Sequence, residues 1–289
     1  MTILSTPHPI EADTETQMKV RRARQGLLVF ACLLIPLSLF GYWFYVNFPD
    51  APLVLPSLPL MLSPGLAAIL TRFLRREGFA DVSFRLRGPR IERAYLLAFA
   101  LPLVVGGAAY GLAYLLGLAR FDPPPFPFAV SSPIAQFALN VIFSLILIIL
   151  LLPSAGGEEI GWRGYLLPRM IDSGIQKPIL LTSLIWGAWH LPVVFAGVYA
   201  VGPSPLLSAA GLMIATLAFG SILAWIRLGT GSIWPCIIAH AAWNAIINGA
   251  FTPATQNATE NAWVGETGIL VAVALVVAAV WLGRSWGSR

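Results

Sequence analysis

The chain has 289 residues, of which 57% are hydrophobic and only 11% are charged, and its mean hydropathy is +0.78. Soluble domains carry about 25% charged residues, so this composition cannot supply a water-facing surface and a soluble enzyme is excluded. The net charge of +5 does not indicate nucleic acid binding, because the basic residues lie in loops and at predicted helix ends rather than on one helix face. The two cysteines, Cys32 and Cys236, lie in separate hydrophobic stretches and predict neither a disulfide framework nor a metal-binding pair.

The hydrophobic stretches predict an all-α fold, a polytopic transmembrane bundle of about eight helices. A bilayer core about 30 Å thick needs roughly 20 apolar helical residues. We therefore expect spans at residues 27–47, 52–71, 94–117, 133–153, 178–198, 206–226, 231–250 and 266–283. Residues 1–25 are polar and are expected to form a disordered tail outside the bilayer, whereas residues 26–289 form a single integral membrane domain.

The basic residues fall almost entirely on one side of these spans. Of the 18 Lys and Arg residues, only Arg120 lies on the opposite side, and seven of the others are in the 72–93 loop. Basic loops remain cytoplasmic, so both termini and the arginine-rich loops are expected to face the cytoplasm. Compact loops favour a bacterial plasma membrane as the location.

Four ionisable side chains lie inside or directly next to predicted spans, where such groups are rare. Ionisable groups inside spans cost about 2.5–3.5 kcal/mol on insertion scales and are functional candidates by default. His190 and His240 each lie inside a predicted span, about 12 and 9 residues from its cytoplasmic start, which places them at similar depth. Glu158 and Glu159 follow the fourth span at its expected cytoplasmic exit. The four groups can therefore meet in one site toward the cytoplasmic side.

The spacing around the two carboxylates favours a division of roles. Glu159 and Arg163 are four residues apart with the glutamate first, which is the better orientation for a helical ion pair. Glu158 points about 100° away on the same helix and remains free for chemistry. By itself, such an ion pair is also typical of an ordinary helix surface.

The spacing around the two histidines places each beside another polar or aromatic side chain. Trp186 and His190 share one helix face, and His240 and Asn244 share another one turn apart. A lone histidine in a span can equally pack two helices through a hydrogen bond. In the third span, Gly107 and Gly111 predict close helix contact.

These groups suit peptide hydrolysis by an activated water. A carboxylate beside an imidazole, shielded from bulk water, can act as a general base, and a histidine with an asparagine on one helix face can donate hydrogen bonds to a tetrahedral oxyanion. Neither HExxH nor GxSxG is present, so the zincin and hydrolase-elbow signatures are missing.

Three sequence blocks together resemble a known family. They are EExxxR at Glu158 to Arg163, an aromatic residue followed four positions later by histidine at Trp186 to His190, and HxxxN at His240 to Asn244. In order and spacing they are similar to the CPBP family, also called Abi, which includes the CAAX prenyl endopeptidases of the Rce1 type and their prokaryotic relatives. The resemblance covers about residues 150–250. Trp186 stands where the family more usually has phenylalanine.

The resemblance implies a membrane endopeptidase of the glutamate type that acts on a membrane protein or a lipidated peptide, possible substrates including prenylated CaaX proteins. It implies that Glu158 is the carboxylate that activates water and that His190 is its partner. His240 and Asn244 would stabilise the oxyanion. Glu159 and Arg163 would support these catalytic residues. No cofactor is then required. An alternative is a zinc ion held by Glu158, His190 and His240; we favour the metal-free version, because it assigns a role to the His240–Asn244 pair.

Two other functions remain open from the sequence. A transporter could use the same groups as a proton relay, but it should have further ionisable groups along a path to the far face, and we find none in the outer halves of the spans. A non-catalytic binding or immunity protein of the same family is the other alternative.

Overall fold

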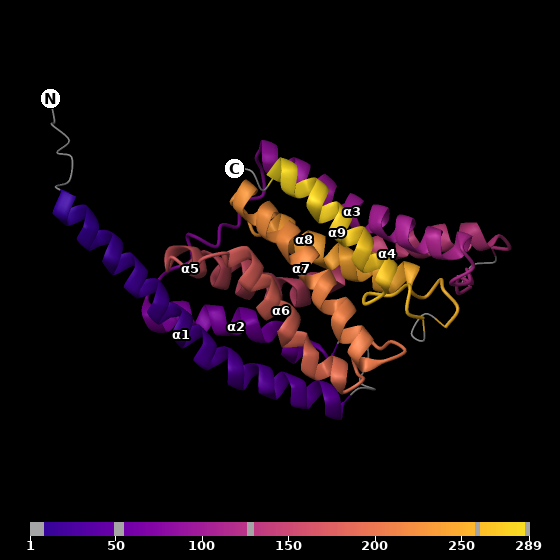
Figure 1. The fold of residues 1–289 in the computed structure, drawn as a ribbon, viewed down its shortest axis with the longest axis horizontal. Helices are drawn as coiled ribbons and strands as arrows, with labels where there is room; N and C mark the ends of the chain where they lie inside the picture. Colours follow the sequence, from indigo (N-terminus) through magenta and orange to yellow (C-terminus); the bar gives the residue numbers. More distant parts are fainter. Residues whose placement is uncertain (1–8, 49–54, 126–129, 258–260, 287–289) are drawn as a thin grey trace.

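The structure, a computed structural model, describes residues 9–48, 55–125, 130–257 and 261–286, which form helices and connecting segments without a named strand. The eight predicted spans correspond to eight helical regions (Figure 1). The helices are α1 (Pro9–Asn47), α2 (Leu58–Arg75), α3 (Pro89–Leu115), α4 (Pro133–Gly161), α5 (Leu167–Asp172), α6 (Pro178–Phe195), α7 (Pro205–Thr230), α8 (Trp234–Trp243) and α9 (Ile269–Trp286). Two π-helical segments, η1 (Trp162–Leu166) and η2 (Asn244–Phe251), continue α4 and α8.

Proline marks the beginning of most of these helices. Pro89, Pro133, Pro178 and Pro205 open α3, α4, α6 and α7. In the first helical turn the missing proline N–H would have had no intrahelical partner, and the fixed φ angle is already helical. Proline therefore determines where these helices begin.

The prediction of a disordered tail over residues 1–25 is wrong for the part that the structure describes, because α1 already begins at Pro9. Residues 10–25 are rich in Glu, Lys, Arg and Gln, which are good helix formers, and adding them to an existing apolar helix avoids the cost of a new nucleus. Lys19 forms an ion pair of 3.0 Å with Asp172 at the end of α5, which anchors this polar extension.

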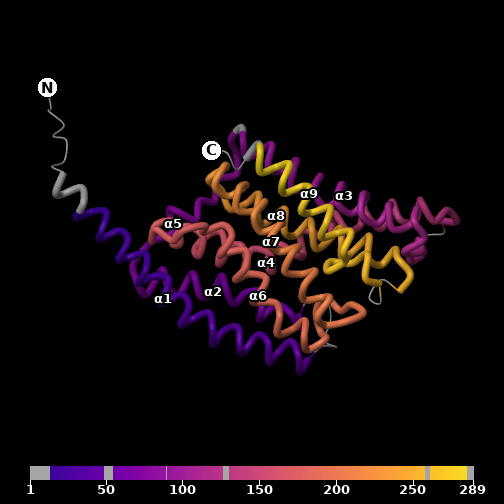
Figure 2. Tube along the Cα trace, viewed as in Figure 1, coloured from indigo at the N-terminus to yellow at the C-terminus, as the bar shows by residue number. Residues whose placement is uncertain are grey.

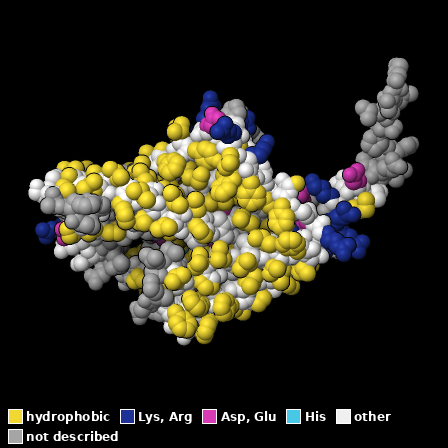
Figure 3. Space-filling model, turned by 180° about the vertical axis from the view of Figure 1, so that it is seen from behind, with side chains coloured by type: hydrophobic (Ala, Val, Ile, Leu, Met, Phe, Trp, Pro, Cys, Tyr) yellow, Lys and Arg dark blue, Asp and Glu magenta, His cyan; other side chains and the backbone are white. Residues whose placement is uncertain are grey.

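Within the described residues, five helices are long and apolar enough to cross a membrane: Thr14–Asn47, Arg90–Leu115, Pro133–Asp172, Pro178–Phe195 and Pro205–Thr230. α2 and α8 do not meet this measure, and α9 counts only as a shorter apolar helix. Large apolar side chains nevertheless cover the outside of the bundle, and the basic side chains lie toward its edges (Figure 3). Lipid is the solvent that such a surface requires, so the protein is an integral membrane protein with a helical bundle.

The fourth span is longer than predicted, and this moves the two carboxylates. The prediction ended the span at residue 153, whereas α4 continues through Pro153 to Gly161 and then through η1 and α5 to Asp172. Glu158 and Glu159 therefore lie inside the helix and the bundle rather than at its cytoplasmic exit. A proline is tolerated here because neighbouring groups in a bundle can satisfy the backbone that it frees.

Close packing of α2 on α4 depends on glycine. A Cβ atom on Gly157 would lie 2.6 Å from the carbonyl oxygen of Met61, and one on Gly65 would lie 2.6 Å from the carbonyl oxygen of Gly157. The predicted close contact at Gly107 and Gly111 is wrong, since a Cβ on either residue would meet no atom within 4 Å. The close contact between helix backbones occurs instead at Gly157, the residue before Glu158.

The helices alternate in direction, so the bundle has two ends with different character. α4 packs against α2, α8 and η2, and α7 packs against α6 and α9. The beginning of α1, α5 and the end of α9 lie toward one end of the bundle, and the connections after α1, α6 and η2 lie toward the other (Figure 2). The arginine-rich 72–93 segment belongs to the first end, which we call the arginine-rich end.

Candidate active site

The three sequence motifs meet at one cavity of about 210 Å³ between α2, α4, α6, α7 and α8. Glu158, His190, His240 and Asn244 all line it. The first three are nearly completely buried, with 2%, 3% and 5% of their surface exposed. The structure therefore brings together the four residues that the sequence selected, although their catalytic roles stay predictions.

Glu158 lies at the centre of this group. The indole Nε1 of Trp186 donates a hydrogen bond of 2.7 Å to its Oε2 atom. The Nε2 atom of His190 lies 3.8 Å from Oε2, and the Nε2 atom of His240 lies 3.9 Å from Oε1. Both distances are too long for direct hydrogen bonds, so the two imidazoles flank the carboxylate without contacting it directly.

The surroundings of His190 select the tautomer of its ring. Its Nδ1 atom lies 2.9 Å from the carbonyl oxygen of Trp186, which can only accept, so Nδ1 carries the hydrogen. In the neutral ring, Nε2 then holds the lone pair and faces Glu158. The ring of Tyr199 stacks on the imidazole at 5.3 Å between centroids, which fixes its plane.

Glu159 joins the two histidine motifs to the arginine. Its Oε1 atom lies 2.8 Å from Nη1 of Arg163 and 2.9 Å from Nδ1 of His240. The predicted Glu159–Arg163 ion pair is therefore present, and it is completely buried. The guanidinium of Arg163 also lies over the ring of Trp186, 4.3 Å from its centroid. One buried ion pair thus supports both His240 and the indole that contacts Glu158.

Asn244 lies one turn after His240, at the point where α8 changes to the π-helical segment η2. It is partly exposed and lines the same cavity. π-helical turns occur frequently at functional sites, because they shift the following side chains relative to an α-helix. The second π-helical segment, η1, carries Arg163.

Sequence reasoning missed two residues of this cavity. Trp186 was identified only as the aromatic residue on the helix face of His190, whereas its indole N–H contacts Glu158 directly. The signal was its departure from the phenylalanine that is usual in the family. Glu266 was placed at the start of the eighth span, but α9 begins only at Ile269, and Glu266 lies in the preceding loop and lines the cavity.

The cavity becomes more exposed toward the end of the bundle opposite the arginine-rich end. Asn244 and Tyr199 are partly exposed and Asn248 is exposed, whereas Glu158 is buried. Tyr45 near the end of α1 and Ser57 before α2 also line this side. The site was expected to face the cytoplasmic side; its more exposed lining residues belong to the connection after α6 and to η2, away from the arginine-rich 72–93 segment.

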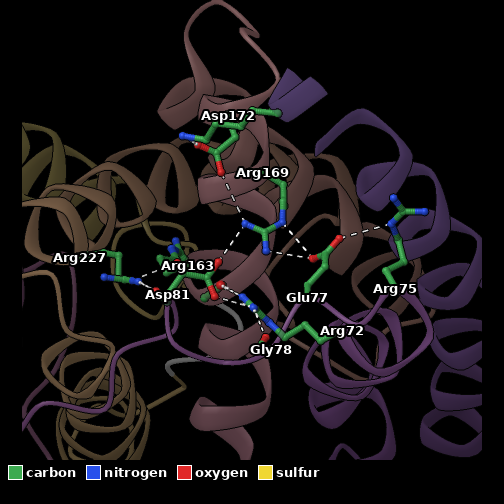
Figure 4. Close-up of polar contacts among 11 residues, drawn as sticks. Arg72, Arg75, Glu77, Gly78, Asp81, Arg163, Arg169, Asp172 and Arg227 are labelled. Atoms are coloured by element: carbon green, nitrogen blue, oxygen red, sulfur yellow. Dashed lines mark hydrogen bonds and ion pairs between the residues drawn. The ribbon is translucent and has the colours of Figure 1, made fainter. Parts of the chain in front are cut away.

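Ion pairs close the arginine-rich end of the bundle (Figure 4). Asp81 forms ion pairs with Arg72 and, at 2.9 Å, with Arg169, which also contacts Glu77 at 2.9 Å. Arg227 donates hydrogen bonds to the backbone carbonyl oxygens of Asp81 and Arg163. Partial burial raises the pKa of Asp81, but the hydrogen bonds and charges of Arg72 and Arg169 outweigh it and lower the pKa below its usual value.

The alternative zinc ligands do not form a close ligand set in this geometry. Among the described residues, no group of three His, Cys, Asp or Glu side chains is arranged to hold a metal ion. Zinc at about 2.0–2.1 Å from each ligand in a tetrahedral site requires ligand atoms about 3.3–3.4 Å apart, whereas the Glu158–His190 and Glu158–His240 separations are 3.8 and 3.9 Å. One carboxylate oxygen of Glu158 already accepts a hydrogen bond from Trp186.

Comparison with known proteins identifies the segment that holds these motifs. Residues 133–246 match the sequence model of the Rce1-like family, described as type II CAAX prenyl endopeptidase Rce1-like. This segment holds all three motifs and is similar to the Rce1-type CPBP family. The chain is also 29% identical over 159 residues to CAAX prenyl protease 2 of Methanococcus maripaludis, an alignment that covers 52% of this chain and 56% of the relative. The chain thus spans little more than half the length of that relative.

Proposed function

We propose that the protein is an intramembrane endopeptidase that hydrolyses a peptide bond of a membrane-embedded or lipid-anchored substrate. The observation that carries this proposal is the position of both histidine Nε2 atoms around the Glu158 carboxylate, at 3.8 and 3.9 Å, in a buried cavity. The Rce1-like family match and the relative named as a CAAX prenyl protease support the same class of reaction.

Glu158 and His190 activate the attacking water in this mechanism. A water hydrogen-bonded between the two groups transfers a proton to the Glu158 carboxylate while its oxygen bonds to the carbonyl carbon of the substrate. The Nε2 lone pair of His190, fixed by the hydrogen bond of Nδ1 to Trp186, orients the second water hydrogen. When the C–N bond breaks, Glu158 returns its proton to the departing amine.

His240 and Asn244 stabilise the tetrahedral oxyanion. Because Glu159 accepts the hydrogen bond from Nδ1 of His240, a protonated His240 keeps a charged partner, and its Nε2–H can donate to the oxyanion. The Asn244 amide supplies a second donor from the same helix face. Arg163 holds Glu159 in place and compensates its charge.

We further propose that the substrate enters from the end of the bundle opposite the arginine-rich end. With the basic loops in the cytoplasm, that end is extracytoplasmic, and the exposure of Asn248 supports it. In a Cys32→Ser background, Asn248→Cys in intact cells should react with a membrane-impermeant maleimide, whereas Arg85→Cys, on the exposed arginine-rich loop, should react only after lysis. The reverse labelling pattern would indicate that the substrate enters from the cytoplasmic side.

The activity is tested with purified protein in lipid nanodiscs and a panel of farnesylated CaaX peptides and lipid-anchored peptides. We expect wild type to cleave members of the panel, and both Glu158→Gln and His190→Ala to lose about 100-fold or more in rate. Glu92→Gln, at an exposed carboxylate outside the cavity, is the matched control and should retain activity. A chelator should leave the rate unchanged. Equal cleavage by wild type and both cavity variants would refute the proposed site, and loss in chelator with recovery in zinc would refute the metal-free mechanism.

A further inference from the structure

The open half of the cavity holds a carboxylate that the proposed mechanism does not use. Glu266 lies in the loop before α9 and is half-buried. The side-chain amide of Asn248 donates a hydrogen bond of 3.2 Å to its Oε2 atom, and the Tyr199 hydroxyl and Trp243 indole lie near it. Glu266 is therefore held in a fixed position on the cavity wall, on the side through which a substrate must pass.

None of the groups that hold Glu266 carries a positive charge. An amide, a hydroxyl and an indole orient a carboxylate but do not neutralise it. No lysine or arginine lines this cavity in the described part of the chain, and its two histidines are hydrogen-bonded to Trp186 and Glu159. The one positive charge that acts on Glu266 from within this cavity is a protonated His240, which also faces Glu158 and Glu159. Three carboxylates thus share one cationic group, and a cationic ligand would complete the neutralisation of Glu266.

We propose that Glu266 is a specificity-determining residue that binds a cationic group of the substrate, an ammonium or guanidinium near the scissile bond. This inference rests on the proposed function and names the substrate class for the same site.

A purely structural role for Glu266 must be distinguished from recognition. Tyr199 stacks on His190 and also lies near Glu266, so loss of the carboxylate could disturb the imidazole. Such a disturbance would lower the cleavage rate of every peptide by the same factor. Recognition of a charge would instead change the ratio between peptides that differ only in charge, and this ratio is the quantity to measure.

The test uses lipid-anchored peptides that are identical except for one position, which carries lysine, glutamine or glutamate and is moved stepwise through the residues on both sides of the scissile bond. At one position we expect wild type to prefer lysine to glutamine by about tenfold in kcat/KM, the scale of a partly desolvated charge pair. Glu266→Gln should remove this preference and still cleave the glutamine peptide. Glu266→Lys should reverse the preference toward the glutamate peptide.

The outcomes separate this inference from the proposed function. Cleavage by wild type with no charge preference at any position, or an equal loss on all peptides in Glu266→Gln, would overturn the role of Glu266 and leave the endopeptidase proposal intact. If wild type cleaves no peptide, the proposed function fails. The role of Glu266 is then tested by peptide binding, measured by fluorescence anisotropy with the Glu158→Gln variant. This variant should bind the lysine peptide more tightly than the other two, and the difference should disappear in Glu158→Gln/Glu266→Gln. Equal binding of all three peptides to Glu158→Gln would refute the role of Glu266.

Discussion

Replacement of Trp186 by phenylalanine removes a single N–H group from the site. The indole Nε1 of Trp186 is the one hydrogen-bond donor that contacts Glu158 at normal hydrogen-bond distance among the described residues, at 2.7 Å. Phenylalanine keeps an aromatic ring in the gap, so the cation–π contact with Arg163 is retained in part. The substitution therefore tests whether this hydrogen bond holds the carboxylate in its reactive position.

The size of the effect follows from the charge of the acceptor. A hydrogen bond to a charged group contributes about 1.5–3 kcal/mol. If this contribution is needed in the transition state, the rate should fall between about 10-fold and 100-fold, because each 1.36 kcal/mol is a factor of ten. The smaller ring also leaves a void, which should lower the stability by about 1–2 kcal/mol.

Trp189→Phe is the matched control for this measurement. Trp189 is also buried, and its indole donates a hydrogen bond of 2.9 Å to the hydroxyl of Ser38, away from Glu158. Both variants should lose similar stability in thermal unfolding, but only Trp186→Phe should lose cleavage activity on the best peptide of the panel. Full activity in Trp186→Phe, or an equal loss in both variants, would refute the assignment of a positioning role to the indole.

Three further predictions concern the supporting structure. Arg163→Met should destabilise the protein by about 3–5 kcal/mol, because it leaves the Glu159 carboxylate buried without its charged partner; the double variant Glu159→Gln/Arg163→Met should recover most of this loss in thermal unfolding, and no recovery would argue against the ion pair. Because the pKa of Asp81 lies below its unfolded value, its ion pairs stabilise the fold above about pH 4 and are lost as the pH falls through the folded-state pKa. Wild type should therefore lose stability more steeply than Asp81→Asn between about pH 5 and pH 3, and parallel pH profiles would contradict this. Gly157→Ala should cost at least about 1–3 kcal/mol, since its Cβ would lie 2.6 Å from a backbone oxygen, whereas Gly107→Ala, with open space around it, should be neutral.

The sequence predicted the parts of the site that depend on helix periodicity. A spacing of four residues places Glu159 next to Arg163 and His240 next to Asn244, and these relations persist because local helix geometry determines them. The common depth of His190 and His240 followed from counting residues along two spans that both start on the cytoplasmic side. Local rules therefore gave the residues of the catalytic group, together with the helical character of the bundle.

The features that were missed depend on contacts between distant segments. The indole of Trp186 reaches Glu158 across 28 positions of sequence, and Glu266 reaches the cavity from a loop that hydropathy placed inside a span. The continuation of α4 beyond Pro153 depends on the neighbouring helices that enclose it, which a single sequence does not reveal. The opening of the cavity likewise depends on the combined exposure of loop residues such as Asn248.

The structure also bears on the alternative of a proton relay. Glu266 adds an ionisable group on the side of the cavity where sequence analysis found none, so a row of titratable side chains leads inward through His240 to Glu159. Beyond Glu159 the next charged groups are Arg163 and then Arg227, which contacts the backbone of Arg163. Guanidinium groups remain protonated at any physiological pH and cannot pass a proton on. The charged groups beyond Glu159 in the described part of the chain are thus arginines, which argues against a proton relay, whereas a buried carboxylate in a cavity is what the proposed activation of water requires.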